Sequence, residues 1–259
     1  MGHYYTWRNG EVIPFYDVPK KDGSGLRPVT IRDARNEKAV PSVNEILSIQ
    51  ANPMLTEWLC REALQFGWDK RGESGDGNEG QVSKHLTFED CQSLWSDERE
   101  KAADRGSELH DLVWEQGIRD GKILEDQVAK RIVDSILALG YKNFEVEKCF
   151  ASRRLGYGGR VDGIAQHDDY GNVVLDLKTI TKKRNPYDKE YSQVAGYKRL
   201  LNEEYNRDIR DAHLIYVVRE SGEVCAVSKL GALQQEALEK LDACFGLWKA
   251  DKHYDPCAA

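Results

Sequence analysis

An aspartate and a lysine two residues apart, Asp176 and Lys178, stand in an apolar stretch where charged groups are costly. Residues 173–180 are rich in Val, Leu and Ile, which is typical of a strand buried on both faces. Because side chains two apart point the same way from a strand, the two charged groups share one face. Each must find a partner or shift its pKa. A lone Asp-x-Lys is usually a structural ion pair, so its neighbours decide whether it does chemistry.

A second carboxylate, Asp162, lies on the preceding strand-like stretch, residues 160–166. Turn-forming residues 167–172 connect it to the stretch that carries Asp176 and Lys178. We therefore expect neighbouring strands, with Asp162 facing the same side as the Asp-x-Lys pair. Two carboxylates that approach each other repel unless they share a proton or bind a cation. Oxygen ligands with few enclosing groups favour Mg²⁺ or Mn²⁺ over zinc.

Three short motifs follow one another along the chain. Residues 158–162 read Gly-Gly-Arg-Val-Asp, residues 176–178 read Asp-Leu-Lys, and residues 193–197 read Gln-Val-Ala-Gly-Tyr. Together they resemble the Gly-x-x-Asp, Asp-x-Lys and Gln-x-x-x-Tyr motifs of the RecB-type branch of the PD-(D/E)XK nuclease superfamily. Lambda-type exonucleases, CRISPR adaptation nucleases and the mitochondrial genome maintenance exonuclease are similar. The resemblance covers residues 97–230, and the flanks resemble phage and prophage exonucleases more loosely.

The resemblance implies an α/β fold with an αβββαβ core, in which helices flank a mixed central sheet. The predicted elements follow that order: a helix over 97–117, strands over 144–150, 160–166 and 173–180, a helix from Asp188, and a strand over 212–219. A further strand and helices are additions to the core. We expect one nuclease domain over residues 1–259, comprising an N-terminal arm and helical cap (1–96), the core (97–230) and a C-terminal helix (231–259).

Two further residues are candidates for the site. His110 falls on the inward face of the first predicted helix, where a lone histidine is usually a satisfied core residue. Gly106 and His110 nevertheless resemble a Gly-x-x-x-His motif that precedes the nuclease core, which implies that His110 is a metal ligand. Alternation along the next strand places Glu145 and Glu147 on one face. Glu147 is either a solvated edge carboxylate or, by the resemblance, an acidic member of the active site.

Cations and polar side chains near the motifs are candidate DNA contacts. Those beside the first motif, which can hold phosphates and stack a base, are Arg153, Arg154, Tyr157 and Arg160. Those that leave the metal site directly, and that we expect to contact phosphates although a charge run is usually only solvated, are Lys182, Lys183 and Arg184. Gln193 and Tyr197 share one helix face, where they form buried hydrogen bonds or orient the site or the DNA backbone.

The N-terminal part of the chain carries weaker signals. Ser42 and Glu45 form a predicted capping box that opens a helix through about Ile49. A second helix is predicted from Pro53, and the glycine-rich residues 67–80 are predicted to be a loop. Residues 1–40 suggest short strands or an irregular arm without an assigned role. On the C-terminal side of the first core helix, residues 123–139 predict an amphipathic helix that ends at Gly140.

Composition restricts partners and location. A net charge of −7 argues against a basic coat over the whole surface, but it leaves room for a local basic groove. No apolar run is long enough to span a membrane, and the N-terminus lacks the pattern of a signal peptide, so we expect a cytoplasmic protein without a membrane partner. A dinucleotide site is excluded, because the glycines at 156 and 158 lack the third glycine of that fingerprint.

Six cysteines are scattered without a C-x-x-C pair, at positions 60, 91, 149, 225, 244 and 257. They are predicted to be reduced thiols rather than a zinc site or a disulfide framework. Some RecB-type nucleases hold an iron–sulfur cluster on one early cysteine and a tight late group. Because Cys244 and Cys257 are too far apart for such a late group, we expect no iron–sulfur cluster.

These signals predict a metal-dependent exonuclease that hydrolyses linear DNA in phage-type recombination, replication or repair. The expected ligands of one or two Mg²⁺ ions, with Mn²⁺ as a substitute, are Asp162, Asp176, the Leu177 carbonyl and His110. Lys178 would hold or help deprotonate the attacking water and offset charge in the transition state. The resemblance implies products with a 5′-phosphate and a 3′-hydroxyl.

Two other functions stay open on the sequence. The chain could be a structure-specific or restriction-type endonuclease, which would also cut DNA that has no end. It could instead be a non-catalytic DNA-binding module that keeps the fold, although the intact motifs argue against loss of catalysis. A single-strand annealing protein is an expected partner by analogy with phage recombination exonucleases alone.

Overall fold

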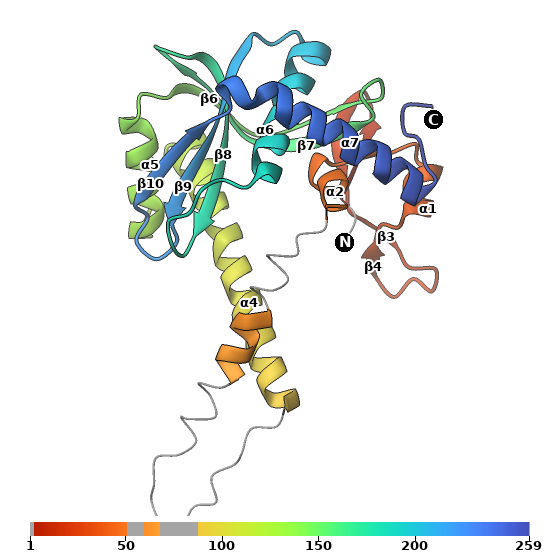
Figure 1. Ribbon diagram of the computed structural model, residues 1–259, viewed down its shortest axis with the longest axis horizontal. Coiled ribbons are helices and arrows are strands. Elements are labelled where there is room, and N and C mark those ends of the chain that lie inside the picture. Colours follow the sequence, from red (N-terminus) through yellow and green to blue (C-terminus); the bar gives the residue numbers. More distant parts are fainter. Residues whose placement is uncertain (1–2, 51–59, 68–87, 259) are drawn as a thin grey trace, which may run out of the picture. The chain divides into compact units, whose positions relative to one another are not determined.

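The computed structural model describes residues 3–50, 60–67 and 88–258 (Figure 1). The chain divides into two compact units, of which one is Met1–Gln50 with Leu109–Ala259 and the other is Ala51–Glu108. In the smaller unit, residues 60–67 are helical, and α4 (Phe88–His110) supplies a long helix whose last two residues belong to the larger unit. The start of the helix predicted from Pro53 and residues 68–80 of the predicted loop lie outside the described residues.

The larger unit is built on a five-stranded sheet with the strand order β10-β9-β8-β7-β6. Its strands are β6 (Lys142–Ser152), β7 (Tyr157–His167), β8 (Gly171–Ile180), β9 (Ile209–Val218) and β10 (Val224–Lys229). β8 and β9 are parallel, whereas the other neighbours are antiparallel. A parallel pair cannot be joined by a tight turn, so α6 (Asp188–Tyr205) crosses between them. The predicted α/β class with a mixed central sheet is confirmed.

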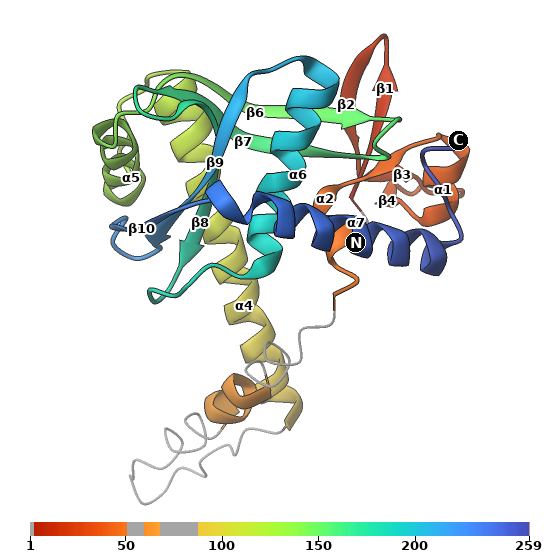
Figure 2. The same cartoon turned by 45° about the horizontal axis from the view of Figure 1, so that its top comes forward.

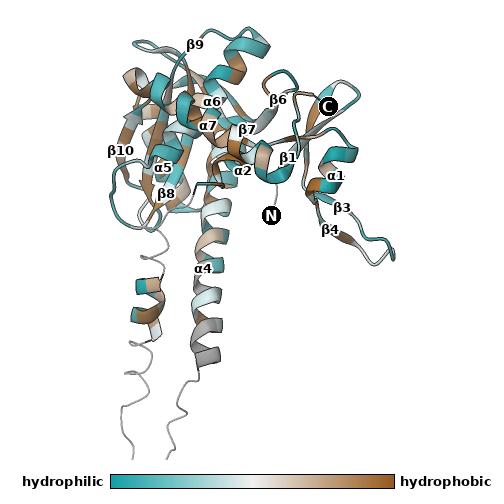
Figure 3. Cartoon of the chain, turned by 45° about the vertical axis from the view of Figure 1, so that its right-hand side comes forward, coloured by the Kyte–Doolittle hydropathy of each residue, from teal (hydrophilic) through white to brown (hydrophobic). Residues whose placement is uncertain are grey.

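Helices cover both faces of this sheet. They are η1 (Asp111–Arg119), α5 (Gln127–Ala138), α6 and α7 (Gln234–Lys252). Val174 packs with Leu200 of α6 in one hydrophobic cluster, the α6-side cluster, whereas Leu175 packs with Ile132 of α5 in another, the α5-side cluster. Adjacent residues of β8 thus serve opposite faces, as the period of a strand requires. Figure 2 shows α6 and α7 together in front of the sheet, and Figure 3 shows hydrophobic residues concentrated on its central strands.

The N-terminal arm contains regular structure. It forms a three-stranded sheet of β1 (Tyr4–Arg8), β2 (Glu11–Phe15) and β5 (Val40–Pro41), a hairpin of β3 (Asp17–Pro19) and β4 (Leu26–Pro28), and α1 (Ile31–Asn36). Helix α2 (Val43–Leu47) begins at the predicted cap, because Oγ of Ser42 accepts the Glu45 N–H at 2.9 Å. The second half of the predicted capping box is not observed, since the Glu45 carboxylate instead accepts the indole N–H of Trp248 at 3.5 Å.

Two helices differ from the predicted ranges. The first does not continue as an α-helix to residue 117, because α4 ends at His110 and a π-helix, η1, follows it. The next helix, α5, begins at Gln127 rather than residue 123, since the Asp126 carboxylate accepts the Ala129 N–H at 2.8 Å and caps it. Ile123 is 94% exposed and belongs to the preceding loop. No helix within the described residues is long and apolar enough to cross a membrane.

Candidate metal centre

Three carboxylates lie side by side across neighbouring strands, on Glu147 of β6, Asp162 of β7 and Asp176 of β8. The pairing register of β6 and β7 places Glu147 opposite Asp162. One step beyond the last β7–β8 pair, Asp162 lies level with Asp176. At this point a side-chain hydrogen bond takes the place of a backbone one between β7 and β8, because Oδ2 of Asp162 accepts the N–H of Leu177 at 2.9 Å. Carboxylates this close repel one another, so the row favours a cation or a shared proton.

The backbones of β6 and β7 are irregular at this row. Glu147 has a φ of 52°, in the left-handed region that side chains other than glycine rarely adopt. On β7, Val161 packs in the α6-side cluster, whereas Gly163, two residues later, faces a tryptophan of the α5-side cluster. A regular strand would place them on one face, so the alternation slips at Asp162. The slip brings Glu147 and Asp162 together toward the start of η1.

His110, the last residue of α4, completes a group of three. Ligand atoms of His110, Glu147 and Asp162 all lie within 4.8 Å of one another. Nε2 of His110 lies 2.8 Å from the Leu177 carbonyl oxygen, and Nδ1 lies 3.6 Å from Oδ2 of Asp162. Because a carbonyl oxygen can only accept, Nε2 is the donor, so the lone pair of Nδ1 faces the carboxylates in the neutral form of His110. A ligating histidine is oriented in this way by its other nitrogen.

The group that converges differs from the predicted ligand set. His110 and Asp162 belong to both sets, and Glu147 joins them. The Leu177 carbonyl, expected to bind the metal, accepts the His110 N–H in this structure. Asp176 turns toward Lys178 and lies outside the group of three. Asp162 was expected to face the same side as Asp176, but the slip in β7 directs Asp162 toward His110.

Lys178 is held between β8 and α6 by a chain of polar contacts. Its Nζ lies 2.6 Å from Oδ2 of Asp176 and donates to Oε1 of Gln193 at 3.0 Å. Nε2 of Gln193 in turn donates to the Tyr197 hydroxyl at 3.1 Å. Gln193 and Tyr197 therefore position the lysine through buried hydrogen bonds, one of the two roles expected for them. Asp176 and Lys178 share one face of β8, as predicted, and α6 covers that face.

Burial and mutual repulsion alter the acidity of this cluster. Burial, followed by the charge of Asp162, raises the pKa of Glu147 to about 7. Burial also raises the pKa of Asp176 to about 6, against the opposing effect of Lys178. For Lys178, burial lowers the pKa, but Asp176 and Asp162 outweigh it and the pKa is raised. Glu147 and Asp176 therefore take up a proton at a higher pH than ordinary carboxyl groups do.

The predicted DNA contacts fall into different environments. Nε of Arg160 lies 2.8 Å from Oε2 of Glu147, at the edge of the carboxylate cluster. Lys182 and Lys183 are exposed on the segment that leaves β8. Arg153 is exposed and stacks over the ring of Trp7, 4.6 Å from its centroid. Arg154 is also exposed but forms ion pairs with two glutamates near the end of α6, at 2.8 and 2.5 Å.

Two predicted DNA contacts are structural residues instead. Tyr157 is 1% exposed, and its hydroxyl accepts the Nε–H of Arg199 at 2.8 Å, so its ring cannot stack on a base. Arg184 donates from both terminal nitrogens to Glu190, at 2.8 and 2.6 Å, and its guanidinium lies 4.0 Å from the ring centroid of Tyr187. Arg184 therefore anchors the start of α6, where Glu190 is buried and needs a counter-charge.

Three aromatic residues near the site were not predicted. Trp114 of η1 is fully buried beneath Gly163, next to the slip in β7. The hydroxyls of Tyr5 and Tyr16, from the N-terminal arm, lie 3.1 Å apart. Tyr5 lies against β7, since a Cβ atom at Gly158 would lie 3.1 Å from its ring. Burial lowers the pKa of Arg160, but Glu147, Tyr16 and Tyr5 raise it overall. Trp114 follows His110 by one helical turn, so its position on the same helix face could have been predicted from the sequence. Nothing in the sequence pointed to the two tyrosines.

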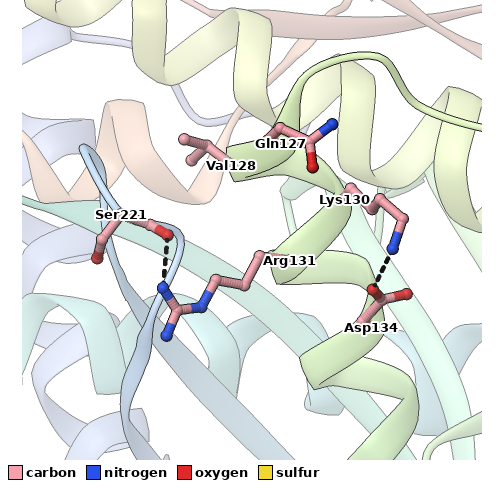
Figure 4. Close-up of a pocket in the computed structure, with 6 residues that line it drawn as sticks. All are labelled: Gln127, Val128, Lys130, Arg131, Asp134 and Ser221. Atoms are coloured by element: carbon pink, nitrogen blue, oxygen red, sulfur yellow. Dashed lines mark hydrogen bonds and ion pairs between the residues drawn. The ribbon is translucent and has the colours of Figure 1, made fainter.

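A surface hollow elsewhere in the larger unit does not involve these side chains. Figure 4 shows that it lies between the first turns of α5 and the β9–β10 turn. Its charged residues have partners of their own, because Lys130 pairs with Asp134 at 2.8 Å and Arg131 donates to the Ser221 carbonyl at 3.4 Å. The hollow therefore offers no competing reactive group, and the carboxylate cluster is the candidate functional site.

Comparison with known proteins adds no relative to this geometry. No protein-family model matches the chain, and no curated protein matches it. The functional interpretation therefore depends on the side chains that converge from the end of α4 and from β6, β7, β8 and α6.

Proposed function

We propose that this chain is a divalent-metal-dependent deoxyribonuclease of the RecB-type branch of the PD-(D/E)XK superfamily. The observation that carries the proposal is the meeting of His110, Glu147 and Asp162 beside the anchored amine of Lys178. Carboxylates and an imidazole for a cation, with an amine next to them, are groups suited to phosphodiester hydrolysis. The order α5, β6, β7, β8, α6, β9, in which α5 takes the place predicted for the helix over 97–117, is compatible with the αβββαβ core of that superfamily.

The residues present fit a hard divalent cation such as Mg²⁺ or Mn²⁺. Among the described residues, Oε2 of Glu147 and Oδ2 of Asp176 find no hydrogen-bond donor, although their side chains are only 6% and 2% exposed. Each has a charge contact alone, with Arg160 or Lys178, and buried oxygens in this state are costly. His110, Glu147 and Asp162 would hold the ion, with Asp176 beside them. When bound, it lowers the pKa of water and neutralises charge on the phosphate.

Lys178 would act on the transition state as a cation. Lys178 donates one hydrogen bond, to Gln193, and its close contact with Asp176 is an ion pair, so N–H donors of the ammonium remain for the substrate. Because its pKa is raised, Lys178 stays protonated at neutral pH and is a poor general base. Its role is therefore to orient the attacking water and offset negative charge on the phosphoryl oxygens.

The substrate that we propose is linear DNA, degraded from an end. Arg153, Lys182 and Lys183 are exposed cations of the larger unit that can contact a DNA backbone. The test is digestion of end-labelled linear DNA and closed circular DNA side by side, with Mg²⁺ and again with EDTA. An exonuclease consumes the linear DNA, leaves the circle intact and stops in EDTA. Cleavage of the circle would indicate an endonuclease, and binding without cleavage of either substrate would contradict a hydrolytic role.

A further inference from the structure

Arg160 holds the buried carboxylate of Glu147 through one edge of its guanidinium. Its Nε lies 2.8 Å from Oε2 of Glu147, and the Arg160 side chain is 53% exposed. In the part of the chain that the structure describes, this is the only ion pair of Arg160. Because the contact uses Nε, the four N–H donors of the two terminal nitrogens remain for other acceptors. Arg160 thus links a buried carboxylate to the surface.

A divalent ion would compete with this contact. Glu147 is one of the three residues whose ligand atoms approach one another, so an ion held there takes the carboxylate that Arg160 now neutralises. A guanidinium and a divalent cation on the same carboxylate repel each other. Ion pairs with one half-exposed partner are weak compared with coordination by several ligands, so the arginine is the group that leaves.

We propose that Arg160 is an exchangeable counter-ion, which neutralises Glu147 while the centre lacks metal and transfers to a DNA phosphate once a divalent ion binds Glu147. Arginine suits this transfer, because its planar fork matches phosphate oxygens and its charge is permanent. This inference rests on the proposed nuclease function and adds a coupling: metal and DNA bind cooperatively, because the metal releases the residue that the DNA needs. Arg160 is thus a substrate-binding residue that becomes free to contact DNA only when the metal is bound.

The chain contains a matched control, an arginine whose partner carboxylate lies on the same strand as Glu147. Arg207 pairs with Glu145, two residues before Glu147 on β6, through two contacts of 2.7 and 3.0 Å. Glu145 is not a member of the group of three. Arg207→Gln therefore removes a positive charge, together with an ion pair whose carboxylate lies two residues from Glu147, without touching the proposed exchange.

The first experiment measures Mn²⁺ binding to the full chain without DNA, by electron paramagnetic resonance of the free ion at about pH 8. We expect Arg160→Gln to bind Mn²⁺ about fivefold more tightly than the wild type, because the ion no longer displaces a cation. Arg207→Gln should leave the affinity unchanged. Equal or weaker Mn²⁺ affinity in Arg160→Gln overturns the exchange. A wild-type chain that binds no Mn²⁺ overturns the proposed function as well, which separates the two failures.

The second experiment measures affinity for an end-labelled oligonucleotide, with Mn²⁺ and with EDTA, in a Lys178→Ala background that prevents cleavage. We expect Arg160→Gln to weaken binding about tenfold with Mn²⁺ and less than twofold in EDTA, where Glu147 retains the arginine. Glu147→Gln, which frees Arg160 without removing it, should strengthen binding in EDTA. An equal loss in both conditions, or no gain from Glu147→Gln, contradicts the exchange. Circular dichroism verifies that each variant is folded.

Discussion

Replacing Gly159 with alanine tests how closely the motif that ends in Asp162 packs against α6. A Cβ atom at this position would lie 2.3 Å from Cε1 and 3.0 Å from Cζ of Tyr197. Carbon atoms in contact lie about 3.5–4.0 Å apart, so an alanine requires the ring to move by about 1 Å. Tyr197 is 3% exposed, and its hydroxyl is tied to Gln193. We therefore expect Gly159→Ala to cost about 3 kcal/mol, the upper part of the range for overpacking.

The assay is urea-induced unfolding followed by tryptophan fluorescence, together with the thermal midpoint, which should fall by about 6–12 °C. Gly246 of α7 is the matched control, because an added Cβ there meets no atom of the described residues within 4 Å. Gly246→Ala should stabilise the chain by up to about 1 kcal/mol through helix propensity. Movement of the Tyr197 ring would also displace Gln193 from Lys178 and reduce cleavage by about 100-fold. If Gly159→Ala unfolds at the wild-type urea concentration, the close packing of Tyr197 on β7 is refuted.

Three further outcomes follow from the site and the core. Lys178→Ala should reduce the single-turnover cleavage rate by about 10²–10³-fold with DNA affinity retained, and wild-type cleavage would remove Lys178 from the mechanism. Mg²⁺ at about 100 times its Kd should raise the unfolding free energy by about 2.7 kcal/mol in calorimetry; Asp162→Asn, whose amide oxygen can still accept the Leu177 N–H, should lose most of this gain, and an equal gain would exclude Asp162 as a ligand. Burial lowers the pKa of His213 from 6.5 to about 4. The unfolded chain therefore binds this proton at a higher pH than the folded chain, so stability should fall by up to about 3 kcal/mol as the pH drops from 6.5 toward 4, and His213→Gln should flatten that profile in urea unfolding.

The residue pattern predicted side-chain directions correctly where the period of the helix or strand alone decides them. The apolar stretch around Asp176 and Lys178 forms β8, and both residues face α6 as the period of two requires. Gln193 and Tyr197, four residues apart, hydrogen-bond to each other on one helix face. The expected pairing of β7 with β8 through a short turn is also observed. These relations depend on neighbours in sequence, so a residue pattern contains them.

The residue pattern gave wrong predictions where a partner far away in the sequence decides the role of a side chain. Strict alternation placed Glu145 and Glu147 on one face, but the left-handed backbone at Glu147 separates them. Glu145 pairs with Arg207 on the surface, whereas Glu147 turns into the carboxylate cluster. Tyr157 looked like a base-stacking residue until the fold buried it against α6. Nothing in the residue types distinguishes these outcomes, because they depend on which strand lies opposite.

The sequence by itself therefore determined the order of helices and strands, the α/β class, and the identity of nearly all the groups that could act on a phosphodiester. Only the tertiary structure decided which of them meet: His110, Glu147 and Asp162 converge, while Asp176 turns to Lys178. The physical reason is that periodicity fixes direction relative to the local backbone, whereas the register of three strands and the slip at Asp162 fix distances between segments far apart in the chain.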